Sequence, residues 1–267
     1  MTSSPSVQLY TVRDAIADDL PAAIARIAHL GYTKVEPYSF DYRTDELARA
    51  FADAGVTAPS GHASVIDADD PDRVFDAAEQ LAIESIIDPF VPSERWRTAD
   101  DAYRLADRVN ELAALAGSRN LRFGYHNHQW EFANKDQGRS VYAFFVERLA
   151  PDVILELDTF WSTVGGEDTP ALLRSLSSRV QFLHIKDGIV RGDIATALPS
   201  SESALDVPDA LAAAFKRQTP AGQGDVDVAA ILAAAPDAVR VVEFDDYEHD
   251  IFEGLAESLA WLKENDK

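Results

Sequence analysis

Carboxylate and imidazole side chains that could hold a metal ion recur at the ends of four strand-like apolar runs in the chain. The runs occupy residues 125–131, 156–158, 184–187 and 241–245. Because side chains alternate between the two faces of a strand, the polar residues of a run can share one face while Leu157, Ile185 and Phe244 take the other. A fold that gathers these strand ends in one place would form a divalent-metal site.

Composition restricts both the metal site and the partners. The chain has no cysteine, so thiolate ligands and disulfide bonds are excluded, and a metal must be held by oxygen and nitrogen atoms. The 24 lysine and arginine residues stand against 46 aspartate and glutamate residues, which gives a formal net charge of −22. Such a charge repels phosphate backbones and anionic lipid headgroups, so we expect neither a nucleic-acid nor a membrane partner.

The first residues carry no targeting pattern. Residues 1–5, Met-Thr-Ser-Ser-Pro, lack the basic and apolar regions of a signal peptide. No apolar run approaches the roughly 18 residues that a membrane-spanning helix needs. We therefore expect a cytoplasmic protein.

An alternation of strands and helices must position the polar groups. Runs rich in β-branched residues predict eight strands, at residues 7–10, 34–36, 56–62, 85–88, 121–128, 153–158, 180–186 and 239–243. Segments of helical period separate them, with start and end signals at Asp18 or Asp19, Gly31, Thr44, Gly55, Thr98 and Gly117. A final helix over residues 252–262 would cover the last strand.

This alternation predicts a single domain over residues 1–267 with the α/β architecture of a (β/α)8 TIM barrel, a fold of about 250 residues. In such barrels the working groups lie at the C-terminal ends of the strands, where the four runs have theirs. Residues 188–224 are too long for an ordinary connection, and we expect them to form an active-site flap or an interaction loop.

Seven segments resemble, in order, those of a known family. They are Val-Gln-Leu-Tyr-Thr-Val-Arg-Asp at 7–14, Gly-Tyr-Thr-Lys-Val-Glu at 31–36, Tyr-His-Asn-His at 125–128 with Glu-Phe at 131–132, Leu-Asp-Thr at 157–159, His-Ile-Lys-Asp at 184–187, Gly-Gln-Gly-Asp-Val-Asp at 222–227 and Val-Glu at 242–243. The set is similar to the sugar phosphate isomerase/epimerase family of xylose-isomerase-like TIM barrels, which includes tagatose 3-epimerases, hydroxypyruvate isomerases and inosose dehydratases. Each motif alone is weak, but the ordered set is specific and covers nearly the whole chain.

The resemblance implies one divalent metal ion held by Glu, Asp, His and Glu. Asp158, His184 and Glu243 match three of these ligands. Many relatives carry the first Glu where this chain has His126, so the resemblance assigns that place to Glu131, with His126 as the alternative. The ion implied is Mn2+, with Mg2+, Co2+ or Zn2+ as alternatives.

Such an ion can hold a ketone and its neighbouring hydroxyl and stabilise the enediolate formed when the adjacent C–H loses its proton. The function expected is therefore a metal-dependent isomerase or epimerase, or a dehydratase or lyase, acting on a small keto-sugar or polyol. In the epimerases two metal-bound glutamates move the protons. Here His126, His128 and Lys186 add to Glu243 as catalytic acids and bases, which favours elimination or hydration slightly.

Other residues have expected roles beside the metal. Glu36, His62, Trp130 and Arg13 are candidate substrate contacts. Core packing is the alternative for Trp130, and surface pairing with a nearby aspartate is the alternative for Arg13. Glu156 lies one layer deeper than Asp158 on the same strand face, where an ion pair or support for the ligands is expected.

Two other classes of function remain as alternatives. A metallo-endonuclease of the same fold would need more metal ligands and a basic DNA-binding face, and the chain has six histidines and a charge of −22. A non-catalytic barrel subunit of a hetero-oligomer would not need the ligand set. Assembly into a homo-oligomer is left open by the sequence.

Overall fold

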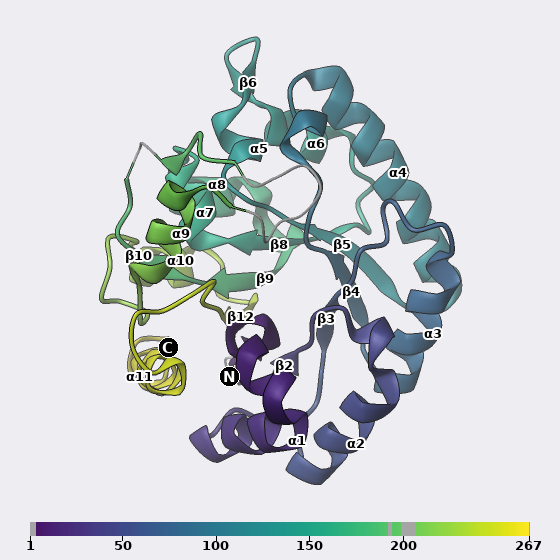
Figure 1. Ribbon diagram of the computed structural model, residues 1–267. Helices are drawn as coiled ribbons and strands as arrows, with labels where there is room; N and C mark the ends of the chain where they lie inside the picture. Colours follow the sequence, from purple (N-terminus) through teal and green to yellow (C-terminus); the bar gives the residue numbers. More distant parts are fainter. Residues whose placement is uncertain (1–3, 192–193, 199–206, 267) are drawn as a thin grey trace.

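Eight parallel strands form a nearly closed barrel in the computed structural model, which describes residues 4–191, 194–198 and 207–266 (Figure 1). Around the barrel they are β2 (Lys34–Glu36), β1 (Ser6–Gln8), β12 (Val239–Val242), β9 (Val180–Ile185), β8 (Ile154–Asp158), β5 (Arg122–His126), β4 (Ser85–Asp88) and β3 (Ser60–His62). Isolated bridges join the two end strands, between Lys34 and Thr57 and between Tyr38 and His62. The predicted TIM barrel is confirmed.

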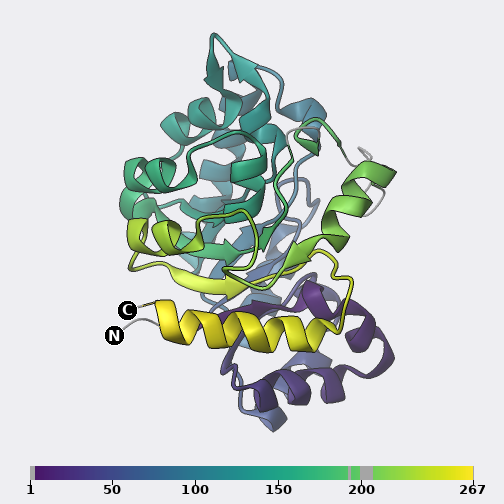
Figure 2. The same ribbon diagram turned by 90° about the vertical axis from the view of Figure 1, so that its left-hand side faces the viewer.

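Helices cover the outside of the barrel. They are α1 (Arg13–Leu30), α2 (Thr44–Ala54), α3 (Pro71–Leu81), α4 (Ala99–Ser118), α6 (Val141–Arg148), α8 (Thr169–Leu176), α10 (Val228–Ala234) and α11 (Ile251–Asn265). Figure 2 shows α11 lying beside α1, with both termini at the same end of the molecule. Within the described part of the chain, no helix is long and apolar enough to cross a membrane.

Short elements lie in the connections that follow the strands. They are α5 (Trp130–Ala133), α7 (Thr159–Val164), α9 (Asp209–Lys216), the antiparallel pair β6 (Lys135–Asp136) and β7 (Arg139–Ser140), and the antiparallel pair β10 (Asp187–Gly188) and β11 (Gln218–Thr219). The predicted segment 188–224 thus contains α9 and β11, and its residues 192–193 and 199–206 lie outside the described residues.

Local capping chemistry explains several helix ends. Thr98 begins α4 with a capping box, in which its side chain accepts the N–H of Asp101 and Asp101 accepts the N–H of Thr98. Gly31 ends α1 in the left-handed region with φ 102°. Asp19 was expected near the start of this helix, but α1 begins at Arg13 and is interrupted at Asp19, whose Oδ1 accepts the N–H of Ala22.

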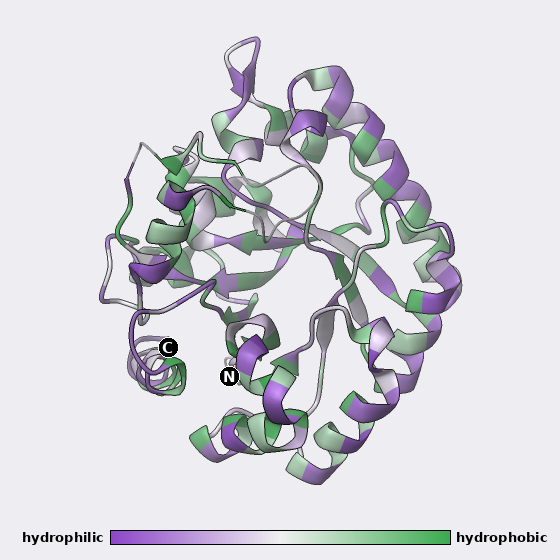
Figure 3. Ribbon diagram, in the orientation of Figure 1, coloured by the Kyte–Doolittle hydropathy of each residue, from purple (hydrophilic) through white to green (hydrophobic). Residues whose placement is uncertain are grey.

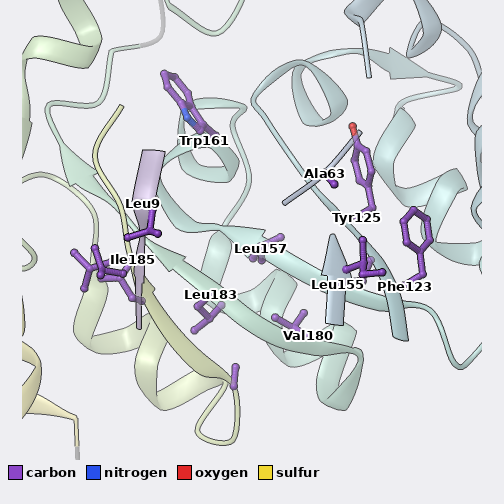
Figure 4. Close-up of a cluster of buried hydrophobic side chains, with 14 of the residues drawn as sticks. Leu9, Ala63, Phe123, Tyr125, Leu155, Leu157, Trp161, Val180, Leu183 and Ile185 are labelled. Atoms are coloured by element: carbon purple, nitrogen blue, oxygen red, sulfur yellow. The ribbon is translucent and has the colours of Figure 1, made fainter. Parts of the chain in front are cut away.

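Strand alternation separates two apolar layers. Inside the barrel lies an inner apolar layer, a small cluster of Ile87, Ile154, Phe182 and Val241. Between the barrel and the helices lies the larger core, to which Phe123, Tyr125, Leu155, Leu157 and Leu183 belong (Figure 4). The helices are correspondingly two-sided, with hydrophilic residues along the outer face of α3 and α4 (Figure 3). Above this inner layer, the inward-facing positions of the strands hold polar side chains.

A substitution at Gly124 of β5 tests the packing inside the barrel. A Cβ atom at Gly124 would overlap the carbonyl oxygen and Cγ1 of Ile154 on β8. We expect Gly124→Ala to lower the free energy of unfolding by about 1–3 kcal/mol, as overpacking does in tight cores. The control is Gly117→Ala in α4, where a Cβ meets nothing within 4 Å and alanine favours the helix. Urea unfolding of both variants measures the difference, and equal stability would show that the barrel interior yields at this point.

Candidate metal centre and catalytic cavity

The polar groups of the four runs meet inside the barrel at the C-terminal ends of its strands. Period-two alternation turns Asp158 of β8 and His184 of β9 inward, while Leu157 and Leu183 belong to the outer core. The side chains that meet there are His62, His126, Glu156, Asp158, His184, Lys186 and Glu243.

Four of these side chains form a group suited to a divalent ion. His126, Asp158, His184 and Glu243 each offer one ligand atom, and these atoms all lie within 4.8 Å of one another. Nδ1 of His184 lies 2.6 Å from Oε2 of Glu243, and Nε2 of His126 lies 3.9 Å from Oδ2 of Asp158. Two imidazole nitrogens and two carboxylates are a suitable donor set for Zn2+, Mn2+ and related ions.

Glu156 holds three imidazoles beneath this group. Its Oε2 atom lies 2.5 Å from Nε2 of His62, 3.2 Å from Nδ1 of His126 and 3.1 Å from Nε2 of His184. His126 and His184 therefore each direct one ring nitrogen to a buried carboxylate and the other toward Asp158 or Glu243. A carboxylate in this place fixes the tautomer and the orientation of a ligating histidine.

A second buried carboxylate, Glu36 of β2, supports two of these imidazoles, His62 and His184. Its hydrogen-bonding and ion-pair partners are Gln8, Ser60, His62 and His184. Burial raises the pKa of Glu36, and the neighbouring Glu156 raises it further. Against the effect of burial, the imidazoles of His184 and His62 hold the pKa of Glu156 well below its usual range. Glu36 is fully buried beside these imidazoles, and its role as a substrate contact stays a prediction.

Lys186 lies among the carboxylates at the open side of the group. Its Nζ is 3.1 Å from Oδ2 of Asp158 and 2.8 Å from Oε2 of Glu243, and it donates to both oxygens of Asp245 at 2.9 Å. Burial alone would lower the pKa of Lys186, but the three carboxylates outweigh it and raise the pKa well above its usual value. Lys186 therefore carries its positive charge at neutral pH.

Protonation of the group is linked to binding of a divalent cation. Burial alone would lower the pKa of His184, but the carboxylates of Glu156 and Glu243 raise it well above its usual value, so this imidazole must lose a proton to bind a metal ion. Burial, with Glu243 adding to it, raises the pKa of Asp158 to about 6 although Lys186 opposes the shift. Beyond its ion pair with Lys186, Oδ2 of Asp158 has no hydrogen-bond partner among the described residues. Burial and the adjacent His184 lower the pKa of His126 to about 3, so this imidazole is neutral and can coordinate a metal.

Glu131, the predicted ligand, lies outside this group of four, and its role as a ligand stays a prediction. The strand β5 ends at His126, and Glu131 follows in the single turn of α5. Its Oε1 accepts the O–H of Tyr125 at 2.9 Å, and its Oε2 accepts the N–H of His128 at 3.0 Å. Because Tyr125 points to the opposite face of β5 from His126, Glu131 lies on the helix side of the barrel. His126, the alternative ligand, is the residue that joins the group.

The ligand group borders the floor of a cavity of about 440 Å³ at the barrel mouth, where His126 and Glu243 line the cavity while Asp158 and His184 are fully buried. The predicted site residues that line it are His62, His126, His128, Trp130, Lys186 and Glu243. Arg13 lies elsewhere: its guanidinium donates to the carbonyl oxygen of Tyr10 at 3.1 Å and stacks over the Tyr10 ring at 4.4 Å. Arg13 thus contacts the lining residue Tyr10, and its own contact with substrate stays a prediction.

Other lining residues had no predicted role. Asp245 shares the inward face of Glu243 at a spacing of two, and this spacing was a usable signal. Gln218 fixes Asp245 by donating to its Oδ2 at 2.6 Å and accepting its N–H at 2.7 Å. Leu211 and Phe215 come from α9, far along the chain from the strands that they approach, and their sequence is that of an ordinary amphipathic helix.

The barrel and its buried acid–imidazole centre define a TIM-barrel protein with a candidate metal site at the C-terminal ends of its strands. The chain belongs to the xylose isomerase-like TIM barrel family, whose model matches residues 24–265. The resemblance seen in the seven sequence segments is thereby confirmed. No curated protein has a sequence that matches the chain.

Solved structures share the fold over its whole length. A sugar phosphate isomerase/epimerase from Parabacteroides distasonis has a TM-score of 0.75 and 20% identity, over 98% of this chain and 96% of that one. The probable 3-DHS dehydratase AsbF from Bacillus anthracis, involved in petrobactin synthesis, has a TM-score of 0.69 and 14% identity, over 98% and 99%. The IOLI protein with a bound zinc atom has a TM-score of 0.68 and 15% identity, over 99% and 98%. These likenesses establish the fold.

The buried carboxyl of Glu131 gives the folded protein a specific pH dependence. Burial raises the pKa of Glu131 from 4.5 to about 8. Between these values the carboxyl is protonated in the fold and ionised in the unfolded chain, so stability falls as the pH rises, by about 1.4 kcal/mol per unit. We expect Glu131→Gln, which cannot titrate, to lose less stability than the parent protein between pH 5 and pH 8.

The measurement is urea unfolding at several pH values. Glu264→Gln, at an exposed position in α11, is the control and should keep the parent profile. Parallel profiles for the parent protein and Glu131→Gln would contradict the expectation, because they would mean that Glu131 is ionised in the fold.

Proposed function

We propose that this protein is a divalent-metal-dependent enzyme that acts on a keto-sugar or polyol, as an isomerase or epimerase, or as a dehydratase or lyase. The observation that carries the proposal is the group of His126, Asp158, His184 and Glu243, which borders the floor of the cavity. Family membership supports it, as do the sugar phosphate isomerase/epimerase and the probable dehydratase among the solved structures of the same fold.

The residues around the ion have separable tasks. A divalent ion held by the four ligands would supply Lewis-acid polarisation of a carbonyl group and its neighbouring hydroxyl. Lys186 is charged and reaches the cavity, so it can donate a hydrogen bond or a proton to a substrate oxygen on which negative charge develops. Asp245 holds the ammonium group of Lys186 at the side of the ligand group.

His128 is the candidate base. Its ring lines the cavity and stacks on Trp130 at 4.4 Å between centroids, with the planes 6° apart. Burial, together with the nearby His126, lowers the pKa of His128 well below its usual value, so the ring is neutral at pH 7. A neutral imidazole in reach of the cavity can accept the proton of a C–H beside a carbonyl. The neutral base and the charged Lys186 form the pair that isomerisation and elimination both require.

The donor set leaves the identity of the ion to experiment. We propose Mn2+ first, with Mg2+, Co2+ and Zn2+ as alternatives, and the zinc atom in the IOLI protein supports the presence of a divalent ion in a barrel of this fold. A small-molecule substrate and a cytoplasmic location complete the proposal.

The first test is metal binding. The purified chain, stripped with a chelator and reloaded, should bind one divalent ion per molecule, measured by elemental analysis. Asp158→Asn should weaken binding at least about 100-fold and remove turnover, because a ligand to the ion is lost. Asp53→Asn, at an exposed position in α2, is the matched control and should change neither. Chains that bind no stoichiometric ion would contradict the proposal and favour a non-catalytic barrel subunit.

The variant Glu156→Ala tests whether Glu156 supports the ligand residues or itself coordinates the ion. We expect this substitution to lower the free energy of unfolding by about 3 kcal/mol, because it removes a buried carboxylate that contacts three imidazoles and leaves Nδ1 of His126 without its partner. Metal affinity should fall less than in Asp158→Asn. Unchanged thermal stability with a complete loss of metal would place Glu156 among the ligands instead.

The second test follows the proton. In D2O, deuterium should enter the carbon next to the carbonyl of a keto-sugar substrate, because isomerisation, epimerisation and elimination all begin with loss of that proton. His128→Ala should slow the exchange about 100-fold or more and leave metal affinity within about twofold. NMR and mass spectrometry report the label and its position. Turnover without label, after internal return of the proton is excluded, would indicate a hydride shift.

A further inference from the structure

The cavity above the ligand group has two chemically different parts. Its floor is charged and carries His126, Lys186, Glu243 and Asp245. Its walls carry six aromatic side chains, Tyr10, Tyr38, Phe90, Trp130, Trp161 and Phe215, beside smaller and polar residues such as Ser39, Ser64 and Gln129. The floor suits the hydroxyl and carbonyl groups of a sugar, whereas the walls present apolar ring surface.

The cavity is larger than the reacting sugar requires. Its volume is about 440 Å³ among the described residues. Pockets from about 300 Å³ upward hold drug-sized ligands, which exceed a single sugar ring. A substrate that fills the cavity therefore carries a second group beyond the sugar.

The walls indicate the chemistry of that second group. Trp161 of α7 and Phe215 of α9 meet edge to face, 5.7 Å between centroids, and Leu211 lies one helical turn before Phe215. Phe90 packs its ring at nearly 90° to His128, 5.9 Å away. Gln129, a polar residue of the lining, donates its amide N–H to the carbonyl oxygen of Ala197 at 2.8 Å.

A second sugar placed against Trp161, Leu211 and Phe215 would bring hydroxyl groups to side chains whose single polar group is the indole N–H of Trp161, so several hydroxyls would lose water without gaining a partner. A flat apolar ring pays no such penalty and gains the offset or edge-on contacts that aromatic walls favour. Extending the proposed function above, we propose that the substrate is a keto-sugar derivative bearing an aryl group, with the sugar on the charged floor and the aryl ring against Trp161 and Phe215.

Binding of three stable glycosides tests this assignment without turnover. The probes are methyl β-D-glucopyranoside, phenyl β-D-glucopyranoside and the disaccharide cellobiose, titrated into the full chain by calorimetry. The phenyl glycoside should bind at least about tenfold more tightly than the methyl glycoside, as expected for burying one phenyl ring. Cellobiose should bind no more tightly than the methyl glycoside.

Phe215→Ala locates the aryl site. It should weaken binding of the phenyl glycoside about fivefold or more and leave the methyl glycoside within about twofold. Tyr103→Ala, at an exposed aromatic position in α4, is the matched control and should alter neither. The circular dichroism spectrum and melting temperature of each variant establish that the fold is retained, and Leu211→Ala replaces Phe215→Ala if that variant is unfolded.

Three results would overturn the aryl assignment. The first is equal affinity for the phenyl and methyl glycosides, which includes no binding of either. The second is tighter binding of cellobiose than of the phenyl glycoside, and the third is an equal loss of affinity for both glycosides in Phe215→Ala. Metal binding is measured separately on the same preparations. A chain that binds no ion but prefers the phenyl glycoside would overturn the proposed function and leave the aryl site standing, so the two failures are distinguishable.

Discussion

The carboxylate of Glu156, buried among three imidazoles, is the interaction on which the arrangement of the centre depends. Glu156 has no exposed surface, and an ionised carboxylate in such a place must be paired or hydrogen-bonded. Its partners come from three different strands, β3, β5 and β9. Because His126 and His184 each direct one nitrogen to a buried carboxylate, their other nitrogens face Asp158 and Glu243. The position of one carboxylate in the layer below thus fixes two candidate ligands in the layer above.

The same constraint explains the charge distribution around the cavity. Lys186 is held by Asp158, Glu243 and Asp245 and remains charged, whereas burial keeps His126 and His128 neutral. A cationic hydrogen-bond donor, Lys186, and a neutral imidazole, His128, therefore line the same cavity. This separation of acid and base arises from environment, because the carboxylates surround the lysine and the aromatic ring of Trp130 covers His128.

The barrel makes these contacts possible because alternate side chains of each strand face the barrel interior and the surrounding helices. On β8, Ile154 packs in the inner apolar layer, Glu156 holds the imidazoles and Asp158 joins the ligand group, while Leu155 and Leu157 pack against the helices. Phe182 and His184 of β9, with Lys186 directly after its end, repeat the same order of layers. The rigid core beneath and around the polar groups holds them in place, which is the condition for a preorganised site.

The barrel, the strands that carry chemistry and most of the polar residues of the centre could be predicted from the sequence, because alternation along a strand depends only on local order. The sequence placed Asp158, His184 and Glu243 at strand ends and Glu156 one layer below. Contacts between segments that are distant in the chain depend on the tertiary structure and could not be read from local order. Glu131 turned away because β5 ends at His126 and the following turn packs its carboxyl under Tyr125. Phe215 reached the cavity through the folding back of α9, a contact between segments distant in the chain that no local pattern encodes.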